Sequence, residues 1–264
     1  MSDLTRRTVL AGALAACASY PAYGQITRLK SARIIVCLAD NENQGIVPTT
    51  AQLGNGQDPR NNLYWGALYG VKSYFSRQKE TWPGKTATES EVNMSLQRRV
   101  GILDEAVFIS PPSPSRNEFR IVSAEAWDGR YMKQAIQAFY ESLAQSDSSP
   151  DLTIFVGHNG LMDFPLFAPV PSAEVKARNL ERKRAAMVFA CNSADYFTDT
   201  IRNYGVNPAV MTHGLMAPEA YAIEPAVRAW FDGKNNMNIR RAAAAGYAKY
   251  QKIPVRNARR LFGI

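Results

Sequence analysis

Hydrophobic residues are arranged along this chain in two alternating patterns. Short continuous apolar runs, typical of strands buried on both faces, are followed by longer segments in which apolar residues recur every three or four positions, as on one face of a helix. We expect strands at residues 33–39, 105–109, 118–124, 152–156, 185–190 and 209–212. We expect helices at 62–76, 172–184, 193–204, 218–231 and 238–250, and one more with an apolar face from Met132 to Leu143.

Strands that alternate with helices predict a fold class. They favour a mostly parallel sheet with right-handed crossovers and helices on both faces, which is a three-layer α/β/α sandwich. Hydrophobic residues make up 46% of the 264 residues, enough for a full core. We therefore expect residues 25–264 to form one α/β domain.

The first 24 residues are interpreted as a targeting segment. Arg6 and Arg7 precede an apolar stretch, and Ala22 to Gly24 offer small residues for cleavage, as in a twin-arginine export signal. A lipoprotein signal that is processed at Cys17 is the alternative. Either reading places the protein in the periplasm or outside the cell, and no other segment is long and apolar enough to span a membrane.

Charge and motifs exclude several functions. The formal net charge is +8, with basic residues denser from Arg240 to Arg260, but no nucleic-acid motif accompanies them. A solvated basic face or attraction to anionic surfaces explains this charge better than nucleic-acid binding. The chain has no glycine-rich phosphate loop and no GxSxG serine motif. With two His and no paired Cys, we expect neither a metal site nor a cofactor.

The candidate chemistry lies after two successive strands. His158 follows the apolar run 152–156, and Cys191 follows the run 185–190. If these strands are parallel neighbours, both side chains emerge at the sheet edge where open α/β sheets bind ligands. A thiol and an imidazole within reach of each other form an activated nucleophile. A buried structural Cys and a hydrogen-bonded loop His are the alternatives, and His213, which also follows a strand, competes with His158 as the base.

Cys37 and Cys191 remain once the targeting segment is removed. Cys37 lies inside the first strand and Cys191 at the end of a later one. If one strand separates them, their backbones are roughly 9–10 Å apart, beyond the reach of a disulfide. We expect two free thiols, with Cys37 buried and unreactive.

These residues carry a resemblance to a family. A strand ending on His158 with Gly160 nearby, and a strand ending on Ala190-Cys191 about thirty residues later, resemble the caspase, legumain, gingipain and clostripain group of cysteine peptidases. The resemblance implies a caspase-like fold, Cys191 as nucleophile and His158 as acid–base. It also implies an oxyanion hole from the backbone N–H groups of Gly160 and Cys191, although the extra residue Asn159 leaves the first donor open between Asn159 and Gly160.

The resemblance also suggests a substrate. Family members hold the side chain before the cleaved bond with polar groups from the loop after the first strand, where this chain has Asp40 and Glu42. These acids would suit a basic residue of a peptide or protein substrate. The alternative is an inactive periplasmic module of the same fold that binds a partner through this loop and the basic C-terminal region.

Overall fold

The computed structural model describes residues 28–83, 100–110, 118–145 and 149–264. The proposed export signal and Cys17 lie outside these ranges. Within them, no helix has both the length and the apolar character needed to cross a bilayer.

Six strands form one sheet in the order β2-β3-β1-β4-β5-β6. Neighbouring strands are parallel except for β2, which runs antiparallel to β3 at one edge. The expected mostly parallel sheet is therefore confirmed, and so is the adjacency of the two strands that precede His158 and Cys191. The strands are β1 (Arg28–Cys37), β2 (Ile102–Ser110), β3 (Glu118–Trp127), β4 (Leu152–Val156), β5 (Ala185–Phe189) and β6 (Asn207–Val210).

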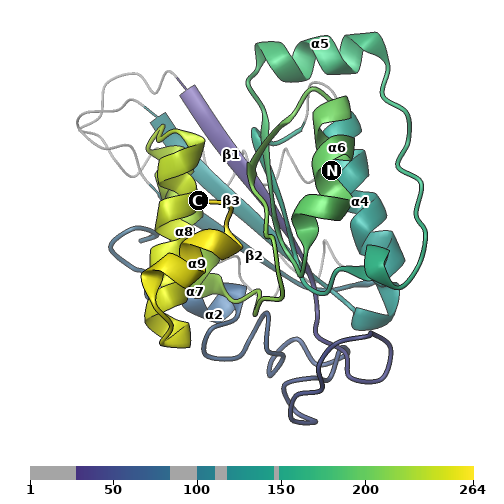
Figure 1. Ribbon diagram of the computed structural model, residues 1–264, viewed down its shortest axis with the longest axis vertical. Coiled ribbons are helices and arrows are strands. Elements are labelled where there is room, and N and C mark those ends of the chain that lie inside the picture. The colour runs from purple at the N-terminus through teal and green to yellow at the C-terminus, as the bar shows by residue number, and fades with distance from the viewer. Residues whose placement is uncertain (1–27, 84–99, 111–117, 146–148) are drawn as a thin grey trace.

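Helices cover both faces of the sheet (Figure 1). One layer contains α4 (Met132–Ala144), α5 (Ala173–Glu181) and α6 (Ser193–Asn203). The other contains α2 (Val71–Arg77), α7 (Ala220–Phe231), α8 (Asn236–Gln251) and α9 (Val255–Leu261). Two separate buried clusters lie between the sheet and these layers, because successive residues of β1, β4 and β5 point to opposite faces. The protein is thus the three-layer α/β/α sandwich that the sequence predicts.

Some predicted elements were wrong in extent. The helix expected at 62–76 begins only at Val71, and turns occupy the residues before it. Gly66 explains part of this difference, since a side chain there would meet the backbone oxygens of Arg60 and Pro59 at 2.0–2.4 Å. Asn62 does not begin a helix either, because its side chain accepts from the N–H of Ala39 and donates to the carbonyl of the same residue. The last helix, α9, was not predicted at all.

The carboxyl ends of β1, β4, β5 and β6 meet at one edge of the sheet. The long loop after β1 lies at this edge, in the lower part of Figure 1. The segments after β4, β5 and β6 carry His158, Cys191 and His213. This edge is therefore the place to look for a functional site.

Candidate active site

The loops that follow β4 and β5 are bonded to each other. Gly157 donates its N–H to the carbonyl of Phe189 at 3.2 Å, which continues the pairing of Val156 with Phe189. The side chain of Asn159 then donates to the carbonyl of Cys191 at 2.8 Å. These two bonds hold the His158 loop against the Cys191 turn.

Gly157 sets the direction of the backbone in the loop that follows β4. Its φ of +147° is one that residues with a side chain rarely adopt, and an added Cβ would lie 2.8 Å from the carbonyl oxygen of Cys37. Only glycine fits such a backbone position without strain. The chain can therefore turn sharply out of β4 and present His158 at the sheet edge.

His158 is buried, and a carboxylate holds its ring. Nε2 lies 2.6 Å from Oδ2 of Asp163, five residues further along the same loop. Since a carboxylate only accepts hydrogen bonds, Nε2 carries the proton, which leaves the lone pair on Nδ1 in the neutral ring. No described residue bonds Nδ1. The ring is thus fixed in the tautomer that a general base needs, with its free nitrogen available.

Cys191 is partly exposed and lies against the segment that follows β6. Its Sγ accepts the N–H of Met216 at 3.4 Å and lies 3.6 Å from the carbonyl of the same residue. Among the residues that the structure describes, no hydrogen bond joins this thiol to the His158 ring. The two loops therefore adjoin, as the sequence predicts. The thiol itself contacts Met216.

The turn after Cys191 leads directly into α6. Asn192 has a φ of +49° and stands at the N-cap of α6, where its side chain makes no capping hydrogen bond. Ser193 donates its hydroxyl to the carbonyl of Val188, 2.9 Å away. Cys191 thereby sits just before the N-terminus of the 11-residue helix α6, the end that carries the positive partial charge of the helix dipole.

The backbone N–H groups at this edge of the sheet differ in whether they already have a hydrogen-bond acceptor. Gly160, one of the two expected oxyanion donors, donates its N–H to the carbonyl of His158 at 3.1 Å. The N–H groups of Asn159 and Cys191 have no acceptor among the residues described. The geometry therefore favours Asn159 over Gly160 as the partner of Cys191, the choice that the sequence leaves open.

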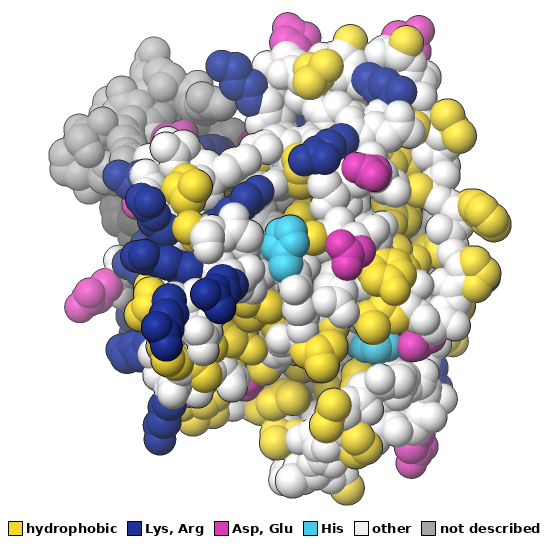
Figure 2. Space-filling view, viewed as in Figure 1, with side chains coloured by type: hydrophobic (Ala, Val, Ile, Leu, Met, Phe, Trp, Pro, Cys, Tyr) yellow, Lys and Arg dark blue, Asp and Glu magenta, His cyan; other side chains and the backbone are white. Residues whose placement is uncertain are grey.

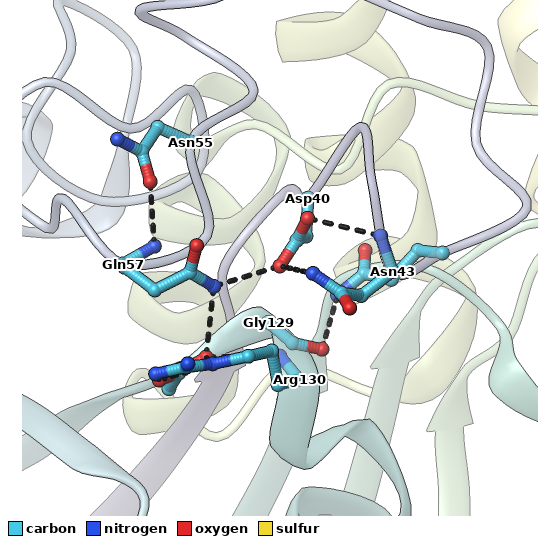
Figure 3. A network of polar contacts seen from close by, with 8 residues as sticks. Asp40, Asn43, Asn55, Gln57, Gly129 and Arg130 are labelled. Carbon is cyan, nitrogen blue, oxygen red and sulfur yellow. Dashed lines mark hydrogen bonds and ion pairs between the residues drawn. The ribbon is translucent and has the colours of Figure 1, made fainter.

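Asp40 is buried at the centre of a polar network that closes the loop after β1 (Figure 3). Its two oxygens accept from the N–H groups of Glu42 and Asn43 and from the side chains of Asn43 and Gln57. Gln57 also bonds Asp128, so the network ties this loop to the end of β3. Four protein donors occupy the carboxylate of Asp40, whereas the side chain of Glu42 is exposed.

Another carboxylate was missed by sequence reasoning. Glu219 lies in the segment after β6, three residues beyond Met216, and is buried. Burial raises the pKa of its carboxyl. The hydroxyl of Tyr221 donates to it at 2.8 Å, and no Lys or Arg pairs with it in the described part of the chain. The N–H of Met216 contacts the thiol, and the N–H of the next residue, Ala217, donates to the hydroxyl of Tyr247 at 3.1 Å, so a short, anchored segment links Glu219 to the thiol.

The side chains of the two remaining candidates, Cys37 and His213, form no hydrogen bond with His158 or Cys191 in the described part of the chain. Cys37 is fully buried, burial raises the pKa of its thiol, and it forms no disulfide with Cys191, as expected. The strand β4 separates their strands, as the sequence argument assumed. The N–H of His213 donates to Leu261 of α9, and a side chain at Gly263 would meet the His213 ring at 2.7 Å. The His213 ring therefore packs on the C-terminal segment.

In the part of the chain that the structure describes, no cluster of three or more His, Cys, Asp or Glu could hold a metal ion. Asp163 and Glu219 are the site residues that sequence reasoning did not name. The only sequence signal for Asp163 is its position within the same short loop as His158. Comparison of this chain with protein-family models, curated proteins and solved structures gives no match in any of the three.

Proposed function

We propose that this protein is a cysteine peptidase in which Cys191 is the nucleophile, His158 the acid–base and Asp163 the residue that orients His158. The observation that carries the proposal is the pair formed by Nε2 of His158 and Asp163 beside the Cys191 turn. A thiol, an imidazole and a carboxylate on adjoining loops at the carboxyl edge are the parts of a catalytic triad.

The proposed reaction begins with the thiol. Sγ leaves Met216 when substrate binds, and its proton passes to Nδ1 of His158. Catalytic hydrogen bonds are often long or absent before substrate is present, so the resting contact with Met216 is compatible with this step. The thiolate attacks the peptide carbonyl carbon, and the electron pair of the C=O bond moves to oxygen. The N–H groups of Asn159 and Cys191 then stabilise the oxyanion.

The second half of the reaction restores the thiol. The C–N bond breaks, Nδ1–H of His158 protonates the departing amine, and an acyl thioester remains on Cys191. Water then attacks the thioester while His158 takes its proton. The thiolate leaves and recovers that proton, and a carboxylic acid is released. Asp163 keeps the ring oriented and stabilises the imidazolium formed in both halves.

Glu219 gives this proposal a substrate preference. A buried carboxylate with a Tyr hydroxyl as its described partner attracts a cation, because pairing restores the stabilisation that its charge loses on burial. The segment from Met216 to Glu219 contacts the thiol, so we place a Lys or Arg side chain of the substrate against it. Glu219 fits this role better than Asp40, whose oxygens four protein donors already occupy, or the exposed Glu42.

A peptide library and a thiol-reactive activity probe test the proposal. Wild type should react with the probe and cleave after Lys or Arg, and Cys191→Ala should do neither. His213→Ala is the matched control for His158→Ala: the first should keep activity and the second should lose it. Glu219→Gln should lose cleavage after basic residues while probe labelling persists, whereas Glu42→Gln should change neither.

The alternative function is that of an inactive module with the same fold, which binds a partner through the loop after β1. The contact that favours this alternative is that of Sγ with Met216, since the thiol makes no hydrogen bond with His158 in the described part of the chain. Slow labelling of Cys191 that is equal in wild type, His158→Ala and His213→Ala would support it and would contradict the peptidase proposal.

A further inference from the structure

The net charge of this protein is confined to its C-terminal region. Residues 233–264 hold eight Lys and Arg and no Asp or Glu, and the preceding 232 residues hold 23 of each sign. The whole excess of +8 therefore belongs to α8, α9 and the short segments beside them. The eight residues are Lys234, Arg240, Arg241, Lys249, Lys252, Arg256, Arg259 and Arg260.

The two helices bring these charges onto one surface, which we call the basic face. A Cβ at Gly263, just after α9, would lie 3.8 Å from the guanidinium of Arg240 near the start of α8, so α9 runs back along α8. Ile239, Ala243, Ala244, Tyr247 and Ala248 of α8 face the core. Seven of the eight basic side chains are exposed and Arg240 is half-buried. Basic side chains gather at the left of the molecule in Figure 2.

Nothing neutralises the basic face within the described part of the protein. None of its eight residues forms an ion pair with a carboxylate there. Arg240 donates instead to the backbone carbonyl of Ala209, and Arg241 to the amide oxygen of Asn238. Elsewhere on the surface, basic residues such as Lys72 and Arg130 pair with acids. The basic face thus keeps its positive charge available for an external partner.

Apolar side chains stand among these cations. Val255 at the start of α9 is 48% exposed, and Met237 at the start of α8 is 44% exposed. Leu215 is 72% exposed in the segment next to α9, where His213 donates to Leu261. Cations interspersed with exposed aliphatic groups suit the interface of an anionic bilayer, which offers phosphates and acyl chains together.

The same surface is less suited to nucleic acid. Single strands are bound by exposed aromatic rings on which bases stack. Tyr250, at the end of α8, is stacked on Tyr221 with ring centroids 4.8 Å apart. Tyr247 is buried in the core. Neither tyrosine of α8 has a ring free for a base.

We propose that the basic face of α8 and α9 docks the protein on the surface of a membrane rich in anionic phospholipid. The segment that begins at His213 contacts both α9 and, through Met216, Cys191. Docking would therefore hold the candidate active site beside the membrane. The proposal does not depend on the peptidase function.

Vesicle sedimentation of the full chain tests this docking. We expect binding to phosphatidylcholine vesicles that contain phosphatidylglycerol, little binding to phosphatidylcholine alone, and loss of binding as salt rises well above about 0.1 M. The triple variant Arg256→Gln, Arg259→Gln, Arg260→Gln should partition on the order of 100-fold more weakly, since each basic residue near an anionic surface contributes roughly fivefold. All three side chains are exposed, so circular dichroism should show an unchanged fold.

A matched triple variant removes three exposed charges elsewhere. Arg60→Gln, Lys79→Gln, Lys133→Gln should bind as wild type does, because these side chains lie outside the basic face. Equal losses in both triple variants would overturn the proposal, as would equal binding to anionic and neutral vesicles. Binding to duplex or single-stranded DNA at an ionic strength that abolishes vesicle binding would also overturn it and would identify nucleic acid as the partner.

Discussion

Replacing Asp163 with Asn removes one negative charge beside His158 and little else. Its Oδ2 lies 2.6 Å from Nε2 of the ring, and Asn can still accept that hydrogen bond. A hydrogen bond to a charged group contributes about 1.5–3 kcal/mol and a neutral one about 0.5–1.5 kcal/mol. Because the Asp163 side chain is 40% exposed, solvent screening reduces the difference to about 1 kcal/mol. That predicts a roughly fivefold slower reaction of Cys191.

The assay is iodoacetamide labelling of Cys191 over time, followed by mass spectrometry between about pH 5 and 8, the range in which His changes charge. Asp163→Ala should be slower than Asp163→Asn, since it leaves the buried Nε2–H without an acceptor. Asp199→Asn is the matched control, because that carboxylate is fully exposed on α6 and pairs with exposed Arg202. It should label at the wild-type rate.

One outcome refutes the reasoning directly. If Asp163→Asn labels as fast as wild type at every pH while His158→Ala is slow, the charge of Asp163 does not act through the ring. Asp163 would then only fasten its loop. In that case Asp163→Asn would lower the free energy of unfolding measured in urea and leave the reactivity of Cys191 unchanged.

Three further predictions concern the surroundings of the site. Gly157→Ala should destabilise the fold by about 3 kcal/mol in urea unfolding, because the new Cβ meets the Cys37 carbonyl at 2.8 Å at a φ of +147°; an unchanged midpoint would contradict the packing described. Cys37 should resist alkylation until the protein unfolds, since burial raises the pKa of its thiol; labelling at the native rate of Cys191 would contradict this. Burial raises the pKa of Glu219, so folding favours its neutral form, and stability is lost as pH rises through the folded pKa. Glu219→Gln should therefore be more stable than wild type at neutral pH, with the gain vanishing near about pH 4; a gain that is equal at both pH values would show that charge is not its cause.

The sheet and the position of the candidate site could be predicted because buried parallel strands have a characteristic sequence pattern. The runs before His158 and Cys191 are fully buried, and such strands read as continuous apolar segments. A polar or reactive residue directly after such a run must lie at the carboxyl edge. Neighbouring strands then bring two such residues together, as the Asn159–Cys191 bond shows for their loops.

Helix extent and loop contacts were harder to predict because they depend on distant backbone. Apolar spacing alone favours a helix from residue 62, but Asn62 is held by Ala39 of the preceding loop and Gly66 by the turn at Arg60. In the same way, only the folded path of its loop brings Asp163 back onto His158. The spacing of residues along the sequence does not predict such contacts.

The roles of the acidic residues are also hard to predict from the sequence, because they depend on which hydrogen-bond donors the fold places around each carboxylate. Asp40 follows β1 directly, so sequence position makes it a natural candidate for a substrate cation. What decides this role is the number of donors that the fold already supplies, and Asp40 has four. Glu219 belongs to no motif in the sequence, yet it is buried three residues from Met216, which contacts the thiol, and its carboxylate accepts from the hydroxyl of Tyr221. A carboxylate that the fold leaves undersupplied with donors gains most from a cationic ligand, and only the packed structure identifies it.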